Sequence, residues 1–348
     1  TAWLVDAWNP EHDAWMAAHR REGRDLLLTP LDRRRWKAGP YRWNSAGFAR
    51  VRSSPWLVLK RSLLSRRLAK QGAARQRALL RMDEALANGY VRRLPATALH
   101  VVVSQNLLPF LWRSGVLAGR TFDVLMTRLP MAALEAQLDR AALRWPESPT
   151  LSDFRAGPAL MEAETAALTA ARYWITAHRA IAQLAGRRAQ LLSWTLPAAR
   201  AADRGSRIVF PASTLSRKGA RELREALRGS SRELVLCGPV VEGADFWSGF
   251  RTCQADPENW LAGAAVVVAP AWVEHQPRRL LAAIASGVPV ITTPASGLEP
   301  GPGVTLVTEG DVTALRGAID AVLSGRPAQL PPDQHPADSG APAAAMHH

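Results

Sequence analysis

The chain alternates short, continuous apolar runs with longer segments of mixed polarity. Short apolar runs rich in β-branched residues are typical of strands buried on both faces of a parallel sheet. Strands that alternate with helices predict an α/β fold with helices on both faces of each sheet. The predicted strands are Leu4–Ala7, Asp25–Leu28, Leu99–Val103, Phe122–Met126, Tyr173–Thr176, Arg207–Phe210, Glu233–Leu236, Ala264–Ala269, Val290–Thr293 and Val304–Val307.

Helix signals fall between these strands. Asn9, followed by Pro10, is typical of a helix start, and Gly287 of a helix end. The stretch 196–206 contains Pro and Gly and predicts a linker, so we expect domains over 1–196 and 197–324 and a disordered tail over 325–348. The predicted helices are 9–21, 56–86, 106–115, 150–171, 220–227, 259–262, 278–285 and 312–323.

The stretch Ala269–Pro300 carries the clearest candidate site. A strand over 264–269 is followed by a polar turn of Glu274, His275 and Gln276, and a helix is predicted to begin after Pro277. Arg278 and Arg279 fall in its first turn, where the helix dipole disfavours cations unless an anion is bound. Backbone N–H groups and positive charge at a helix N-terminus are suited to a phosphate.

Charge is concentrated in one segment. The net charge is +14, and the fifteen Lys or Arg residues between Arg33 and Met82 are accompanied by no Asp or Glu. The first half of this basic insertion (33–82) is expected to be a loop and the second half helical. Three uses are open: a peripheral membrane surface, a nucleic-acid surface or a solvated face in an arginine-rich protein.

Composition bears on membrane insertion, cellular compartment and metal binding. No apolar run approaches the length that spans a bilayer, and the first residues do not resemble a signal peptide. Cys237 and Cys253 match no metal or redox spacing, so we expect a reducing cytoplasm, with the inner face of the membrane as the alternative. No Asp/His cluster predicts a metal site.

Leu215-Ser216-Arg217-Lys218-Gly219 follows one predicted strand, Leu236–Pro239 contains Gly238 at the end of the next, and Glu274 begins the polar turn described above. These three stretches resemble motifs of retaining family four of the GT-B glycosyltransferases, also called group 1. The first looks like the pyrophosphate loop R-L-S-x-x-K-G, and Gly238 looks like its strand-end glycine. The segment from Glu274 through Val290 looks like the E-x7-E helix and its following strand. The resemblance covers about residues 207–324 and implies two Rossmann-like domains whose parallel sheets face each other across a cleft.

By this resemblance, Lys218 contacts the donor pyrophosphate and Glu274 binds hydroxyls of the donor sugar. The donor site would also include Thr214, Arg217, Gly219, Gly238, His275, Gln276 and Arg278, with Arg279 as a further cation. Fixed cations at the leaving diphosphate lower the barrier to glycosyl transfer. The pattern departs from the family at Ala282, where relatives carry the second Glu, and at Thr214, where they carry Arg.

Acid–base candidates follow the first strand. Glu11, His12 and Asp13 lie at the carboxyl edge, where open α/β sheets bind ligands. An inverting enzyme would need a general base, and His12 or Asp13 would be placed to serve. The alternative is that Glu11 and Asp13 only favour the helix dipole. His178 is expected to be a surface or hydrogen-bonded residue.

The resemblance thus implies a hexosyltransferase that moves a sugar from a nucleotide sugar, with UDP or GDP as nucleotide and with retention, and we expect no metal. The acceptor is expected to be a glycolipid or polysaccharide precursor at a membrane surface. The alternatives are a nucleic-acid-modifying glycosyltransferase or nucleic-acid binder, and a degenerate GT-B protein without catalysis.

Overall fold

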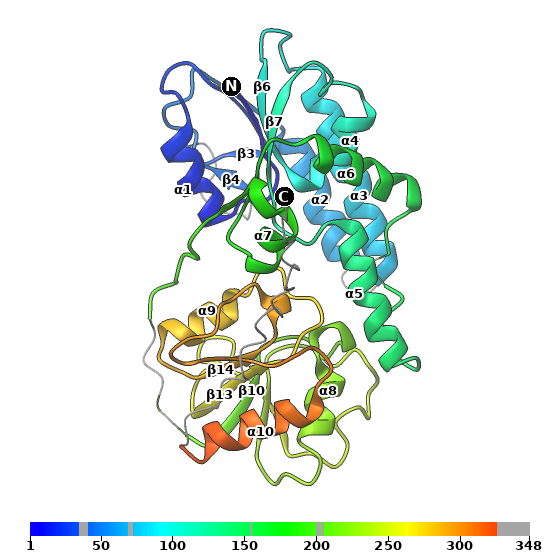
Figure 1. Cartoon of the computed structure of the whole chain (residues 1–348), viewed down its shortest axis with the longest axis vertical. Coiled ribbons are helices and arrows are strands. Elements are labelled where there is room, and N and C mark those ends of the chain that lie inside the picture. Colours follow the sequence, from blue (N-terminus) through cyan, green and yellow to red (C-terminus); the bar gives the residue numbers. More distant parts are fainter. Residues whose placement is uncertain (35–40, 69–71, 154, 200–202, 204, 326–348) are drawn as a thin grey trace, which may run out of the picture.

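The computed structural model describes residues 1–34, 41–68, 72–153, 155–199, 203 and 205–325. These residues form two α/β domains, which lie one above the other in Figure 1. The basic insertion is described except for residues 35–40 and 69–71. Residue 325 is described, while the rest of the expected tail, 326–348, lies outside the described residues. Among the described helices, none is both long and apolar enough to cross a bilayer.

The first domain contains a seven-stranded parallel sheet in the order β5-β2-β1-β6-β7-β8-β9. A separate two-stranded pair, β3 and β4, lies beside it. The strands are β1 (Ala2–Leu4), β2 (Leu26–Thr29), β3 (Leu31–Asp32), β4 (Arg42–Trp43), β5 (Arg50–Ser53), β6 (His100–Ser104), β7 (Thr121–Leu125), β8 (Trp174–Thr176) and β9 (Ala189–Leu191). The helices are α1 (Pro10–His19), α2 (Pro55–Arg67), α3 (Gly72–Val91), α4 (Leu108–Arg113), α5 (Met131–Arg144), α6 (Pro158–Ala170) and α7 (Arg179–Ala185), with short 3-10 turns η1 (Gln105–Leu107) and η2 (Gly186–Arg188).

The second domain contains a six-stranded parallel sheet in the order β12-β11-β10-β13-β14-β15. Its elements are β10 (Arg207–Phe210), η3 (Ser216–Lys218), α8 (Ala220–Ala226), β11 (Leu234–Leu236), β12 (Thr252–Gln254), β13 (Ala264–Ala269), α9 (Arg278–Ala285), β14 (Val290–Thr292), η4 (Pro294–Ser296), β15 (Val304–Leu306) and α10 (Val312–Leu323). The central strands are buried on both faces, as their apolar runs predict.

Local signals set several boundaries as expected. The Asn9 side chain accepts hydrogen bonds from the backbone N–H of Glu11 and His12 at the start of α1. Gly287 follows α9 with a φ of 71°, the left-handed conformation that favours glycine there. The predicted bounds of α9 and α10 agree with the structure.

Other predictions were wrong. The first half of the basic insertion was expected to be a loop, yet it contributes β5 to the edge of the sheet, where charged side chains such as Arg50 and Arg52 remain solvated. Residues 259–262 form a turn instead of a helix, and the helix expected from residue 150 begins at Pro158. The patterns at α5, α7, β9 and β12 were not recognised.

Gly219 lies where the two loops of the second domain approach most closely. Its φ is 80°, and a Cβ at this position would lie 2.1 Å from the Pro270 carbonyl oxygen that follows β13. Only glycine lets the loop after β10 pack against the loop after β13. Gly229 has a similar φ of 82°, but no heavy atom would lie within 4 Å of its Cβ.

These two glycines separate backbone strain from steric overlap. We expect Gly229→Ala to lower the free energy of unfolding by about 1 kcal/mol, through the left-handed backbone alone. Gly219→Ala should cost about 1–3 kcal/mol more, because its methyl group overlaps a backbone carbonyl. Urea unfolding followed by circular dichroism measures both, and equal losses would contradict the close packing of the two loops.

Candidate functional site

Lys218 and Glu274 meet at the carboxyl edge of the second sheet. Lys218 ends η3, in the loop after β10, and Glu274 lies in the turn after the neighbouring strand β13. The Lys218 Nζ donates to Glu274 Oε2 at 2.8 Å, and both side chains are 18% exposed. Burial lowers the pKa of Lys218, and Glu274 opposes that effect. The structure therefore brings together the two residues predicted to carry the site.

Backbone contacts join these two loops. The Arg217 carbonyl accepts hydrogen bonds from the backbone N–H of Trp272 and of Val273, both at 3.0 Å. Gly238 lies beside them, since a Cβ there would be 2.8 Å from the Ser213 backbone. Burial lowers the pKa of the Arg217 guanidinium. The predicted residues Arg217, Gly219 and Gly238 thus shape one connected cradle around Lys218.

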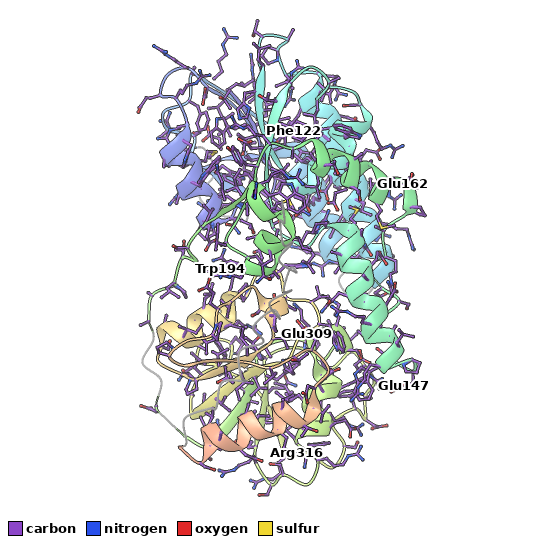
Figure 2. The ribbon with its side chains drawn as sticks, in the orientation of Figure 1. Phe122, Glu147, Glu162, Trp194, Glu309 and Arg316 are labelled. Atoms are coloured by element: carbon purple, nitrogen blue, oxygen red, sulfur yellow. The ribbon has the colours of Figure 1, made fainter. Side chains whose placement is uncertain are left out.

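The first domain holds the Glu274 turn from the other side. His178, just before α7, is buried, and its Nε2 donates to the Glu274 carbonyl at 3.0 Å and the Ala295 carbonyl at 3.1 Å. Gly297 leaves room for its ring, which would lie 2.4 Å from a Cβ there. Trp194, labelled at the junction in Figure 2, stands edge-on to His178. His178 is therefore a hydrogen-bonded residue that fixes the turn.

Arg278 lies elsewhere than its predicted role requires. Its guanidinium donates to both carboxylate oxygens of Glu11, at 2.8 and 2.5 Å, and stacks over Trp194. Glu11 also accepts the Thr195 backbone N–H at 2.8 Å. Burial raises the pKa of Glu11, but these partners outweigh it and the pKa is lowered. Arg278 therefore ties the domains together, and this pairing argues against a primary role in phosphate binding.

Thr214 and Arg279 also face protein groups. The Thr214 hydroxyl accepts from the Trp247 indole at 3.0 Å, and the side chain is fully buried. Arg279 donates to the carbonyl oxygens of Pro211, at 2.7 Å, and Cys237, at 3.0 Å. Both residues thus support the loops around Lys218 through protein contacts. The threonine that replaces the family arginine packs inward, which the motif alone did not indicate.

His275 and Gln276 complete the turn. His275 follows Glu274, and burial, aided by nearby His178 and Lys218, lowers its pKa well below the ordinary value. The Gln276 backbone N–H donates to Glu274 Oε1 at 3.1 Å. This contact holds the second carboxylate oxygen of Glu274, so Lys218 and the Gln276 backbone together fix both oxygens of the carboxylate.

His12 and Asp13 were predicted as candidate bases. His12 is 2% exposed, and its Nε2 donates to the Ile175 carbonyl at 3.1 Å. Burial lowers its pKa to about 4. Such a ring lacks access to a substrate proton, so its placement argues against catalysis. Asp13 is partly exposed and accepts the Asn44 backbone N–H at 3.4 Å, so it lies on the helix surface near β4.

A second polar cluster, missed at the sequence level, lies at the carboxyl edge of the first sheet. Arg61 of α2 donates to Asp83 of α3 at 2.5 Å and to Asp6, after β1, at 3.3 Å. Asn106 donates to the other oxygen of Asp6 at 3.2 Å. These residues are spread over about a hundred positions of the chain. The only sequence signal for the cluster was that Asp6 lies near the end of a predicted strand, where open α/β sheets bind ligands.

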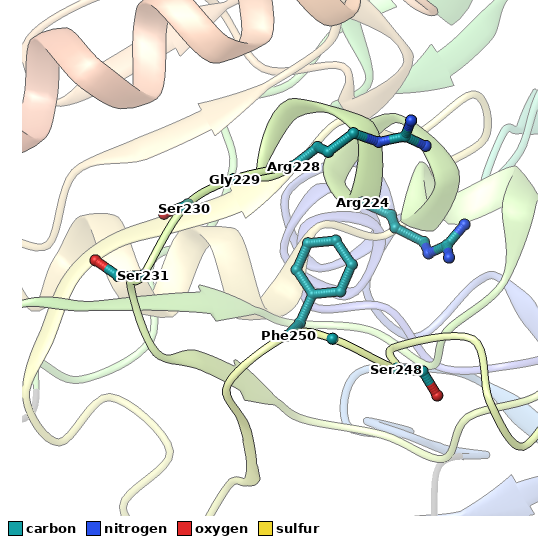
Figure 3. Close-up of a pocket in the computed structure, with 8 residues that line it drawn as sticks. Arg224, Arg228, Gly229, Ser230, Ser231, Ser248 and Phe250 are labelled. Atoms are coloured by element: carbon teal, nitrogen blue, oxygen red, sulfur yellow. The ribbon is translucent and has the colours of Figure 1, made fainter.

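Another pocket lies away from this region. It is lined by Arg224, Arg228, three serines and Phe250, as Figure 3 shows, and has a volume of about 450 Å³. Its loops precede β11 and β12, so it opens at the edge of the sheet opposite Lys218. Within the described residues, no three His, Cys, Asp or Glu side chains are grouped to hold a metal ion.

Residues 209–325 match the family model of the glycosyl transferases group 1. The second domain is a group 1 glycosyltransferase domain. The match includes the Lys218 loop and the Glu274 turn, as the motifs predicted. A search of curated protein sequences found no match.

Solved structures extend the comparison from the group 1 domain to the whole chain. The apo lipopolysaccharide outer core galactosyltransferase WaaB is 13% identical, with 93% of this chain and 90% of that chain covered and a TM-score of 0.52. Sucrose-phosphate synthase from Thermosynechococcus elongatus is 16% identical, with 93% of this chain and 89% of that chain covered and a TM-score of 0.51. Anabaena Alr3699/HepE in complex with UDP and glucose is 14% identical, with 92% of this chain and 88% of that chain covered and a TM-score of 0.50. Identities this low show the fold alone: the two sheets have the predicted GT-B arrangement.

The burial of His12 makes stability depend on pH. Its folded-state pKa of about 4 lies below the unfolded value near 6.5, so the unfolded chain binds a proton first. The resulting stability is complete above about pH 6.5 and is lost as pH falls towards 4, with about 2 kcal/mol lost at pH 5.

We expect His12→Gln to reduce the difference in unfolding free energy between pH 7.5 and pH 5 by about that amount. Urea unfolding at both pH values provides the measurement. His19→Gln changes an exposed histidine at the end of the same helix and should leave the difference unchanged. An identical pH dependence in His12→Gln and the parent would contradict this account.

Proposed function

We propose that this protein transfers a sugar from a nucleotide sugar to an acceptor at the junction of its two domains. The contact between Lys218 and Glu274 carries the proposal. It places a cation and a carboxylate on neighbouring strand ends, at the edge of a parallel sheet where such folds bind ligands. A diphosphate requires the first group, and sugar hydroxyls suit the second.

Lys218 would stabilise the leaving diphosphate. Breaking the bond between the anomeric carbon and the diphosphate oxygen leaves negative charge on that oxygen. A preorganised cation in a partly buried site stabilises this charge more than water does. Arg217 precedes Lys218 and is itself partly buried, which adds positive potential at the same place. Protein cations would thus do this work without a metal.

Glu274 would orient the sugar. The Gln276 backbone N–H holds one of its oxygens, and His178 holds the carbonyl of the same residue. Carboxylates fixed in this way accept hydrogen bonds from hydroxyl groups with defined geometry. Supported by the group 1 match, we propose a hexose donor and transfer with retention. HepE, solved with UDP and glucose, favours UDP over GDP here.

Nucleotide titrations test the two roles separately. We expect Lys218→Ala to weaken UDP and UDP-glucose about equally, by roughly tenfold to a hundredfold, because both carry the diphosphate. Glu274→Gln should weaken UDP-glucose roughly tenfold relative to UDP, because only UDP-glucose carries the sugar that Glu274 would hold, whereas loss of the Lys218–Glu274 ion pair affects both ligands alike. Calorimetric titration with UDP, GDP and their glucose and mannose derivatives measures these affinities.

Lys60→Ala, which removes an exposed lysine of α2, serves as the control and should change nothing. If none of the nucleotides or nucleotide sugars binds, the protein is a degenerate GT-B protein and the proposed transfer is wrong. If UDP-glucose binds and both variants bind it like the parent, the roles of Lys218 and Glu274 are wrong.

We further propose that the enzyme works on a glycolipid or polysaccharide precursor at the cytoplasmic face of a membrane. Helix α2 leaves Trp56, Leu59 and Leu63 exposed, at 80%, 51% and 58% respectively. Their spacing places them on one face of the helix. Exposed Lys60, Arg66 and Arg67 flank them. An apolar stripe bordered by cations complements an anionic lipid surface, where rings insert and charges meet headgroups.

Vesicle flotation tests this surface. The parent protein should bind vesicles of equal parts phosphatidylglycerol and phosphatidylcholine, and less so pure phosphatidylcholine, because the cations need anionic lipid. The triple change of Trp56, Leu59 and Leu63 to Ser should reduce binding at least tenfold through lost apolar burial.

Changing Leu143, Leu184 and Leu196 to Ser removes three other exposed leucines and should have no effect. An equal loss in this control would contradict the α2 surface. A DNA gel shift at matched salt, stronger than the lipid binding and unaffected by the α2 change, would instead support the nucleic-acid alternative.

A further inference from the structure

A cavity of about 300 Å³ lies between the domains, beside the proposed donor residues. Helices α3 and α5 of the first domain form one side, and the loops that carry Arg217, Val273 and His275 form the other. Val273 and His275 flank Glu274 in the chain, and Arg217 precedes Lys218. The cavity therefore adjoins the proposed sugar site, and its volume lies at the lower end of the range for small-molecule sites.

The cavity walls are largely apolar. Leu79 and Leu80 of α3 face Leu134 and Leu138 of α5, and Val273 closes the side towards the second domain. A wholly hydrophilic ligand would leave these side chains without apolar contact, whereas an apolar group would gain about 25 cal/mol for each Å² removed from water. The lining thus favours a ligand with an apolar part.

One end of the cavity is polar. Asp83, Asn106 and Arg128 line it, and Asp83 is 5% exposed. Arg61 donates to Asp83 Oδ1 and also contacts Asp6, so two carboxylates share this guanidinium. Asp83 thus keeps lone pairs that can accept a hydroxyl hydrogen bond.

The charges around Asp83 tune its proton affinity. Burial and the nearby Asp6 raise the pKa of Asp83 to about 8, against the opposing effects of Arg61 and Arg128. Tyr41 also belongs to the cluster, since the Arg61 guanidinium lies over its ring. None of these groups has a role in donor binding as proposed above, which leaves the polar end free for a second substrate.

We propose that this cavity binds the acceptor as an amphiphile, with its apolar group against the leucines of α3 and α5 and a hydroxyl held by Asp83. The inference rests on the proposed glycosyl transfer and names the acceptor class. The acceptor hydroxyl would then lie at the border between the cavity and the sugar held by Glu274. Asp83 acts here as a binding group for that hydroxyl.

Calorimetric titration with n-octyl β-D-glucoside below its micelle concentration tests the proposal. The parent should bind it at least tenfold more tightly than it binds glucose, because glucose lacks the apolar group. Leu79→Trp fills the cavity and should weaken binding at least tenfold. Asp83→Asn keeps the shape, replaces one carboxyl oxygen with an amide NH2 group and should weaken binding by about tenfold.

Leu143→Trp places the same bulk on an 85% exposed position of α5 and should bind like the parent. No binding, equal affinity for glucose, or no effect of Leu79→Trp would overturn the proposal. If Trp56→Ser loses octyl glucoside binding and Leu79→Trp does not, the proposal is also wrong, because the probe would then bind to the exposed surface of α2.

UDP-glucose titration of the same variants separates this inference from the proposed function. Leu79→Trp should bind UDP-glucose like the parent, which also shows that it is folded. Failure of UDP-glucose to bind the parent while octyl glucoside binds the cavity would reject the transfer and leave an amphiphile site. Binding of UDP-glucose without any effect of the cavity substitutions would reject the amphiphile acceptor alone.

Discussion

The docking of the first domain onto the Glu274 turn is the interaction on which the site depends. His178 donates a hydrogen bond to the carbonyl of Glu274. Arg278, four residues after Glu274 in the chain, forms a bidentate ion pair with buried Glu11. Removing one partner of such a pair leaves an uncompensated buried charge, at a cost of about 3–5 kcal/mol. The position of the second-domain turn is therefore set by residues of the first domain. Figure 1 shows α7 inserted at this junction.

This docking changes how the cations near the site are used. From its place in the first turn of α9, Arg278 is expected to bind a phosphate. In the structure its guanidinium instead pairs with Glu11 and stacks on the Trp194 ring. Arg279 is likewise held by two carbonyl groups. Lys218, on the neighbouring loop, contacts Glu274 itself. Positive charge at the site thus comes from the loop after β10, while α9 contributes to the joining of the domains.

Sequence patterns predicted the second domain well, because its strands, turns and helices follow one another as local units. The bounds of α9 and α10, the Gly287 end signal and the Lys218 loop all follow from short-range rules of helix and strand formation. The first domain was harder to predict. The strand β5 carries alternating arginines and is stabilised by pairing with β2, a partner more than twenty residues away, so no local pattern indicates it. Thr214 and His12 are also buried by contacts with residues distant in the chain, so their structural roles were not indicated by local sequence.

By itself, the sequence determined the α/β class and the two-domain organisation, and the resemblance of its motifs to the group 1 family assigned Lys218 and Glu274 to one donor site. It also determined the charge of the 33–82 segment. Only the tertiary structure decided that Arg278 pairs with Glu11, that His12 is buried, and that Asp6, Arg61 and Asp83 converge beside a leucine-lined cavity. Each of these contacts joins residues that are distant in the chain. Their energies come from burial and charge pairing between elements, which no local periodicity records.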